Sequence, residues 1–173
     1  MALLKRLYDK LHLTINASKS AVASAFGRKF LGYCLWAGPK GEVKRAVSMQ
    51  ARERYKQRIR QLTRRSCGRS MNELIEPLRR YVLGWKAYFG LAQTPGVWRA
   101  LDEWMRHRLR AIQLKQWRRG TTAYRASLAL GASPWLARKV AANTRRWWHN
   151  SGHSVNAVLT IAHFDRLGVP RLS

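Results

Sequence analysis

The sequence predicts a mainly α-helical protein: a small N-terminal α/β segment, then a three-helix bundle, then a smaller helical tail. Three observations support this. Apolar and polar residues alternate, as in strands, only early in the chain. From Ser48 onward, apolar residues recur at the spacing of a helix. Gly and Pro residues then divide the last third of the chain into shorter helical segments. We therefore divide the chain into three regions: 1–47, 48–119 and 120–173.

The first region combines one short helix with a few strands. Leucines in 2–10 and at Leu11 fall on one stripe, which predicts a helix there. Apolar residues alternate with polar ones over 11–16, which predicts a strand. The apolar run 30–36 and the segment 42–47 predict further strands, joined by a Gly-Pro-Lys-Gly turn. Three or four strands are few for an independent domain.

The first two long helices have clear start signals. Ser48 is a plausible N-cap, and the apolar stripe behind it continues until Cys67-Gly68 ends the helix. Ser70 and Glu73 match a capping box, so a second helix starts there and extends toward Gly90. Pro77 lies inside this second pattern and predicts a kink or a restart.

The third long helix begins at Thr94-Pro95, where Pro occupies the first helical position. Asp102 and Glu103 are interpreted as first-turn acids that complement the helix dipole. Arg99, Arg106 and Arg110 are assigned to the outer face. The inner, apolar stripe consists of Val97, Trp98, Leu101, Met105, Leu109 and Ile112.

The tail is predicted to hold shorter helices. Gly120 ends the third long helix, and two helices follow at about 121–130 and 133–143. An irregular stretch begins at Trp147-Trp148. The segment 154–167 predicts a last helix, closed by Gly168.

The charge is the strongest functional signal. The chain carries 34 Lys and Arg against 8 Asp and Glu, a formal net charge of +26. A chain with this charge is too basic to be an ordinary metabolic enzyme. It is also 46% hydrophobic, which is too high a proportion for a disordered polycation. Because a polyanion would relieve the self-repulsion, nucleic acid is the expected partner. An anionic membrane surface is the alternative, although no run of 18 apolar residues predicts a membrane-spanning helix.

The positive charge is concentrated in two stretches. No acidic residue lies between Glu103 and Asp165, an interval with 11 Lys or Arg, and 44–69 holds ten cations and one Glu. Arg dominates, and its planar fork grips phosphate bidentately. The candidate RNA-binding residues are Arg52, Arg54, Lys56, Arg58, Arg60, Arg64, Arg65, Arg99, Arg106, Arg110, Lys115, Arg118, Arg119, Arg145 and Arg146.

Tryptophans are interleaved with these cations. Trp117, Trp147 and Trp148 could stack on unpaired bases, but packing inside the protein is the favoured interpretation. For Trp85, Trp98 and Trp104, helical spacing favours packing more strongly.

No catalytic set, metal site or cofactor is predicted. The eight carboxylates form no pattern that would hold two magnesium ions for phosphoryl transfer. His149 and His153 are four residues apart but lack the Glu of a zinc-protease helix. Two cysteines, Cys34 and Cys67, do not make a disulfide framework, and no signal-peptide core is present, so a reducing cytoplasm is expected. The basic N-terminus also resembles a mitochondrial transit peptide, a weaker alternative.

Several motifs, in order, resemble a known family. Leu11-x-Leu13-x-x-Asn16-x-x-Lys19-Ser20 and Lys29-Phe30-Leu31-Gly32-Tyr33 resemble the last blocks of a reverse-transcriptase palm. The segment 84–89 resembles the G-W-x-x-Y-F signature of the maturase domain of bacterial group II intron-encoded reverse transcriptases. The tail is similar to theirs too. The motif residues are Asn16, Lys19, Lys29, Phe30, Leu31, Gly32, Gly84, Trp85, Tyr88 and Phe89.

The resemblance implies a palm remnant, a thumb/maturase region that binds structured intron RNA, and a tail that touches DNA. The Y-x-D-D block and an earlier catalytic Asp, which hold magnesium in that family, are missing, so this chain alone should not polymerise. The sequence therefore predicts a cytoplasmic bacterial RNA-binding protein that stabilises folded group II intron RNA for splicing. The alternatives are the C-terminal half of a split reverse transcriptase with a separate catalytic chain, and a generic or decayed basic nucleic-acid-binding fragment.

Overall fold

The computed structural model describes the whole chain except residues 1, 15, 17–22 and 65–67. It is mainly α-helical with one small sheet, which confirms the predicted fold class. The elements, in order, are α1 (Ala2–Lys10), β1 (Lys29–Phe30), β2 (Tyr33–Ala37), β3 (Val43–Val47), α2 (Met49–Leu62), α3 (Met71–Tyr88), α4 (Pro95–Trp117), α5 (Gly120–Ala129), α6 (Pro134–Ala142), η1 (Thr144–Arg146), α7 (Trp147–Ser151), α8 (Ser154–Val158) and α9 (Ile161–Arg166).

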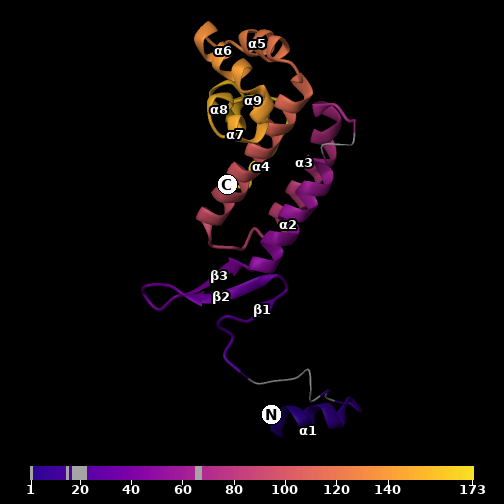
Figure 1. The fold of residues 1–173 in the computed structure, drawn as a ribbon. Helices are drawn as coiled ribbons and strands as arrows, with labels where there is room; N and C mark the ends of the chain where they lie inside the picture. The colour runs from indigo at the N-terminus through magenta and orange to yellow at the C-terminus, as the bar shows by residue number, and fades with distance from the viewer. Residues whose placement is uncertain (1, 15, 17–22, 65–67) are drawn as a thin grey trace.

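The long helices α2, α3 and α4 form the body of the molecule (Figure 1). The sheet lies at one end of these helices, and the short helices α5 to α9 gather at the other. Helix α1 stands apart from the rest, and the C-terminus lies beside the middle of α4. The sites that matter for function are therefore carried by the long helices and by the segments packed against them.

The sheet is antiparallel in the order β1-β2-β3. In its register Tyr33 faces Val47 and Ala37 faces Val43, so β2 and β3 form the predicted hairpin. The strand predicted at 11–16 was wrong for Leu11 to Thr14, while Ile15 lies outside the described residues. The backbone N–H groups of Leu11 and Leu13 both donate to the carbonyl of Tyr8, at 3.0 and 2.9 Å, which turns the chain at the end of α1.

The predicted start signals of α2 and α3 are confirmed. The hydroxyl of Ser48 accepts from the N–H of Ala51, and Ser70 and Glu73 form the full capping box. Helix α3 continues through Pro77 without a restart. Helix α2 ends earlier than predicted, at Leu62, where Thr63 bonds back to the carbonyl of Ile59 through its N–H and its hydroxyl.

The core lies between α2, α3 and α4. Tyr55 and Ile59 from α2, Leu78 from α3, and Met105 and Leu109 from α4 are completely buried. The hydroxyl of Tyr55 donates to the sulfur of Met105 at 3.5 Å. The inner stripe predicted for the third helix is thus confirmed as the stripe that packs against its two partners.

The tail differs from its predicted form. The predicted helices of the segments 121–130 and 133–143 are present as α5 and α6. The stretch predicted to be irregular after Trp147 is instead the short helix α7. The single last helix is divided into α8 and α9, because the hydroxyl of Thr160 accepts from the N–H of His163 and caps a new helix there.

The palm-like motif 29–33 and the maturase-like motif 84–89 meet in space. The hydroxyl of Tyr33 donates to the carbonyl of Tyr88 at 2.7 Å, and the hydroxyl of Tyr88 donates to the carbonyl of Leu31 at 3.0 Å. Between them Gly32 has a φ of +82°, and a Cβ built there would stand 2.9 Å from the ring of Phe89. These contacts fix the sheet on the end of α3.

Gly32→Ala is expected to destabilise the fold by about 1–3 kcal/mol, because Ala at positive φ is strained and its methyl group would overlap the Phe89 ring. The matched control is Gly41→Ala, which has a φ of +77° and open space where its Cβ would be, so it isolates the strain. Urea unfolding of both variants measures the difference. Equal losses would show that the contact with Phe89 contributes nothing.

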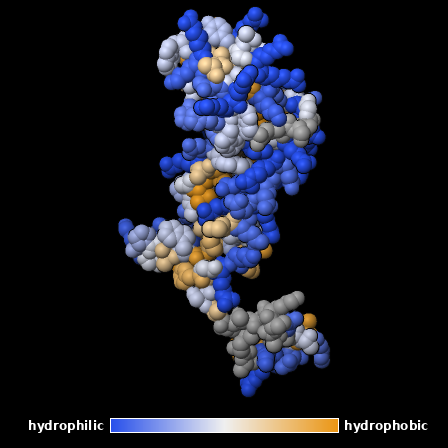
Figure 2. Space-filling model, in the orientation of Figure 1, coloured by the Kyte–Doolittle hydropathy of each residue, from blue (hydrophilic) through white to orange (hydrophobic). Residues whose placement is uncertain are grey.

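The surface has a hydrophobic region and a hydrophilic region. Figure 2 shows hydrophobic residues gathered over the sheet and the neighbouring part of the long helices, while hydrophilic residues cover most of α2 and the end that holds α5 and α6. Within the described part of the chain, the helices are too short or too polar to cross a bilayer.

Candidate nucleic-acid interface

Helix α2 presents a row of cations to solvent. It packs against α3 and α4 through Ala51, Tyr55 and Ile59, which leaves Arg54 and Arg58 on the open side. The other predicted cations of α2 also contact the protein. Arg52 donates to the carbonyl of Val47, Lys56 pairs with Glu53 at 3.3 Å, and Arg60 lies 5.4 Å from the ring centre of Trp104. Arg64 is exposed just beyond α2, and Arg65 lies outside the described residues.

On α4, two of the three cations that were assigned to the outer face are buried. Arg99 is exposed, but only 3% of Arg106 and 5% of Arg110 is accessible, which corrects their assignment to an outer face. The cause is the tail, which folds back over this side of α4. Asp165 approaches Arg106 to 3.5 Å, and the carbonyl of Leu159 accepts from Nε of Arg110 at 2.8 Å.

The two buried guanidinium groups differ in how they are compensated. Arg106 pairs with both Asp102 and Asp165. Arg110 bonds to a carbonyl and lies 5.8 Å from the ring centre of Phe164. Burial lowers the pKa of Arg110, and repulsion from Arg106 lowers it further. Both arginines therefore hold the tail on α4 and are removed from the candidate interface.

Asp102 has a different role from the one predicted. No acid lies in the first turn of α4, and Asp102 lies two turns further in, 5% exposed. Its carboxylate accepts from the backbone N–H groups of Leu172 and Ser173 at 3.0 Å each and from the Ser173 hydroxyl at 2.9 Å. It also pairs with Arg106 at 3.3 Å. The four-residue spacing of Asp102 and Arg106 was the signal that could have indicated this pair.

Asp165 links the tail to the same network. Arg171 hydrogen-bonds to its carboxylate, with Nε 3.1 Å from Oδ2, and Arg106 contributes a further contact. These hydrogen bonds, first of all those from Arg171, hold the pKa of Asp165 below its usual range.

Stability is therefore expected to fall in acid through Asp165. Its folded-state pKa is depressed, so its contribution is fully present above the unfolded-state pKa of about 3.9 and is lost as the pH falls through the folded-state value. Asp165→Asn and Arg171→Gln should each give a shallower decline of the melting temperature between about pH 5 and pH 2 than the unmodified chain. Thermal melts by circular dichroism across that range provide the measurement, and unchanged slopes in both variants would contradict the assignment.

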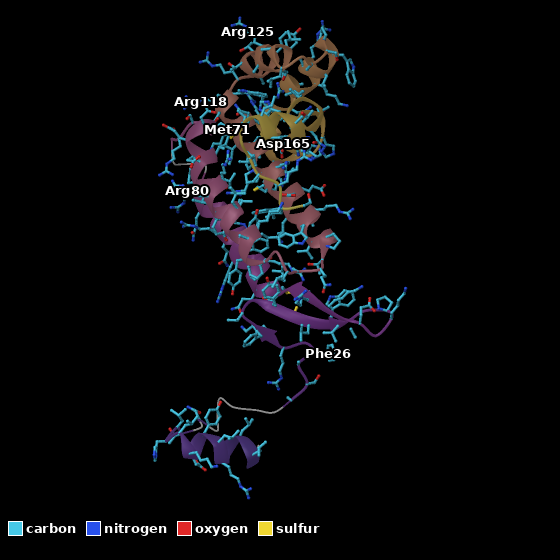
Figure 3. All side chains as sticks on the ribbon, turned by 180° about the vertical axis from the view of Figure 1, so that it is seen from behind. Phe26, Met71, Arg80, Arg118, Arg125 and Asp165 are labelled. Atoms are coloured by element: carbon cyan, nitrogen blue, oxygen red, sulfur yellow. The ribbon has the colours of Figure 1, made fainter. Side chains whose placement is uncertain are left out.

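The connection between α2 and α3, the start of α3 and the end of α4 line an open pocket of about 610 Å³, called here the basic pocket. Its charged lining residues are all cations, and three of them, Arg64, Lys115 and Arg118, were predicted. Figure 3 shows Arg118 beside Met71 at the start of α3. The lining consists of Arg64, Gly68, Arg69, Ser70, Leu74, Ile112, Lys115, Gln116 and Arg118.

Arg69 is the member of the basic pocket that the sequence prediction missed. Its carbonyl accepts a hydrogen bond from the side-chain amide of Gln116 at 3.0 Å, which joins the α2–α3 connection to α4. The residue directly precedes the N-cap Ser70, and a cation next to a predicted helix start, within the basic stretch, was an available signal.

A second pocket, about 600 Å³, lies between α4 and the tail, but it also contains carboxylates. Asp102 and Glu103 line it together with Arg99, Arg106, Arg110 and Arg171, and Arg106 and Arg171 already pair with carboxylates. The basic pocket is therefore the better candidate for an anion.

The remaining predicted cations lie toward the tail. Arg119, Arg145 and Arg146 are exposed. Of the tryptophans beside them, Trp117 is buried and Trp147 is half-buried against the core, so the packing interpretation is confirmed for both. Trp148 packs edge-on against His107 but keeps 42% of its surface exposed. The other three tryptophans pack inside as predicted: Trp85 and Trp98 in the core, and Trp104 against it.

The side chains that could suggest hydrolytic or metal chemistry have structural partners. Ser151 Oγ lies 2.8 Å from His107 Nε2 but donates its own proton to the carbonyl of Trp148 at 2.6 Å. A serine whose proton points at a carbonyl is not activated by the histidine. His149 and His153 stack at 4.2 Å. Among the described residues, no three His, Cys, Asp or Glu side chains lie close enough together to hold a metal ion.

Some of the family-motif residues are buried in the core, and others are exposed. Trp85 and Phe89 are core residues, while Gly84 lies on the open side of α3. Lys29 donates to the side chain of Gln50, and Phe30 is exposed. Asn16 is exposed, and Lys19 lies outside the described residues.

Comparison with known proteins agrees with this geometry. No curated protein matches the chain. Residues 52–129 match the family of the group II intron, maturase-specific domain. The match covers nearly all of α2, the whole of α3, α4 and α5, and every residue of the basic pocket. Residues 52–129 are therefore similar to the maturase-specific domain of group II introns.

Proposed function

We propose that the chain is a maturase-like protein that binds folded group II intron RNA and stabilises its splicing-competent form. The single observation that carries this is the coincidence of the exposed cations with the matched domain. The open face of α2 and the basic pocket both lie within residues 52–129. Guanidinium groups placed on phosphates release counterions and favour RNA folds in which the strands lie close together.

The RNA supplies the splicing chemistry in this proposal, and the protein supplies binding. The 173 residues contain no Y-x-D-D sequence, so we assign no polymerase activity to the chain alone. The exposed Arg145 and Arg146 of the tail extend the basic surface and would serve for contact with DNA. We place this function in the bacterial cytoplasm, where Cys34, which forms no disulfide, would stay reduced.

The test is binding and splicing of a group II intron RNA against an unrelated structured RNA of equal length. The proposal predicts tighter binding to the intron at matched salt concentration, together with faster splicing at low magnesium concentration. Equal affinity for both RNAs would instead support a generic basic module, and binding without any effect on splicing would contradict the maturase role.

A second candidate function rests on the apolar surface beside the sheet. A groove of about 1150 Å³ there is lined by Phe26, Leu35, Trp36 and Met49 among others, and 76% of Met49 is exposed. This surface would dock a separate chain that carries the catalytic part of a reverse transcriptase. Co-purification with a Y-x-D-D-bearing chain, lost in Met49→Glu, would support it. Failure of such a chain to bind would exclude it.

A further inference from the structure

We propose that the basic pocket is a specific binding site for the phosphate backbone of an unpaired RNA strand, such as a bulge, a loop or a free end. The inference rests on the proposed function, and it names which part of the RNA the domain grips and with which residues.

The first argument is the charge inside the pocket. Arg64 and Arg69 contribute from one segment, and Lys115 and Arg118 from another far along the chain. Among the residues that the structure describes, neither Lys115 nor Arg118 has a side-chain hydrogen bond or an ion pair. Glu73, the acid nearest to Arg69 in sequence, forms the capping box with Ser70 and interacts electrostatically with Arg69, but it does not line the pocket. A pocket lined by four cations and no carboxylate attracts an anion strongly.

The second argument is backbone strain at Arg118. This residue has φ +54° and ψ −59°, and the N–H of Arg119 bonds to the carbonyl of Trp117 at 2.5 Å. That combination is a γ-turn with positive φ, a rare and strained conformation that glycine would adopt more easily. Strain of this kind persists where the surroundings hold it, and it gathers at ligand clamps. Here it ends α4 and turns the chain so that Arg118 lines the pocket beside the start of α3 (Figure 3).

The third argument is shape. A duplex presents a convex, wide backbone, which suits the open row of cations on α2. The basic pocket is concave and lies between two chain segments. Its volume is in the range of sites that bind small molecules. An extended single strand can enter such a space, whereas a straight duplex cannot. Proteins that recognise RNA at particular places use its unpaired regions for the same reason.

The experiment measures affinity for a fluorescent 12-nucleotide single-stranded RNA and for a 12-base-pair duplex, using the full chain. The pocket variant is Lys115→Gln/Arg118→Gln. The matched control is Arg125→Gln/Arg138→Gln, which removes the same charge from exposed positions on α5 and α6. The pocket variant should lose about 10- to 100-fold in affinity for the single strand, as expected for two charged hydrogen-bonding contacts, and clearly less for the duplex. The control should lose equally, and only slightly, on both RNAs.

Arg118→Gly provides a second variant that cannot act through misfolding. Glycine relieves the strained turn, so the melting temperature should rise while affinity for the single strand falls. Arg118→Lys, which keeps the charge, should retain more of the affinity than Arg118→Gly.

Two results would overturn the inference: equal losses by the pocket and control variants, or unchanged affinity in Arg118→Gly. If the chain still preferred group II intron RNA in that case, the proposed function would stand without this site. If the pocket variants behaved as expected but the intron RNA was not preferred, the site would stand and the maturase function would fail.

Discussion

Asp102→Asn is expected to lower the free energy of unfolding by about 3–5 kcal/mol, the cost of removing one partner from a buried ion pair. The substitution leaves Arg106, which is 3% exposed, with only Asp165, at 3.5 Å, as a counter-charge. It also places an amide that can donate where one oxygen now accepts from Leu172 and Ser173. The last residues should therefore loosen from α4 as well.

Urea unfolding followed by tryptophan fluorescence measures this loss, and hydrogen exchange at Leu172 measures the loosening. The matched control is Glu103→Gln, one position along the same helix, exposed and outside the network. It should change stability by less than about 0.5 kcal/mol. If the two variants were equally stable, Asp102 would not be the residue that holds the tail.

The second large effect concerns salt. Of the fourteen predicted RNA-binding residues that the structure describes, ten are exposed: Arg54, Arg58, Arg60, Arg64, Arg99, Lys115, Arg118, Arg119, Arg145 and Arg146. If about six to ten phosphates are contacted, affinity for RNA should fall roughly 10³- to 10⁵-fold between about 50 and 200 mM salt.

A single substitution tests which cations contribute. Arg54→Gln, on the open face of α2, should reduce the slope of log affinity against log salt by about 0.7–0.9. Arg80→Gln is the control, because Arg80 lies on α3, 3.7 Å from the carboxylate of Glu76 (Figure 3). Fluorescence titrations at several salt concentrations give both slopes. A shallow slope in the unmodified chain, or the same change in both variants, would contradict binding through α2.

Local interactions explain what could be predicted from the sequence. Ser48 and Ser70 cap their helices through contacts only three residues long, so the residue types at those positions were sufficient. The apolar period of α4 likewise identified Met105 and Leu109 as core residues, because one face of a helix is set by spacing alone.

Long-range packing explains what could not be predicted from the sequence. Arg106 and Arg110 have the spacing of a solvent-facing stripe, and they are buried only because the tail, some 50 residues later, folds over them. The basic pocket is similar: the sequence identified Arg64, Lys115 and Arg118 as cations, but not that two distant segments bring them together. The positive φ of Arg118 has no signal in residue type, since arginine is not a residue that turns usually select.

The contacts between Asp102 and the final residues also set an order of events during synthesis. Helix α4 leaves the ribosome with Asp102, Arg106 and Arg110 while their partners are still untranslated. Loop closure over 70 residues must follow, and contacts of such sequence separation form late. Until residues 159–173 have been made, the side of α4 that ends up buried is an open, cationic surface. This part of the fold therefore forms late in synthesis, and a shortened product that lacks residues 159–173 would leave Arg106 and Arg110 accessible to any nearby polyanion.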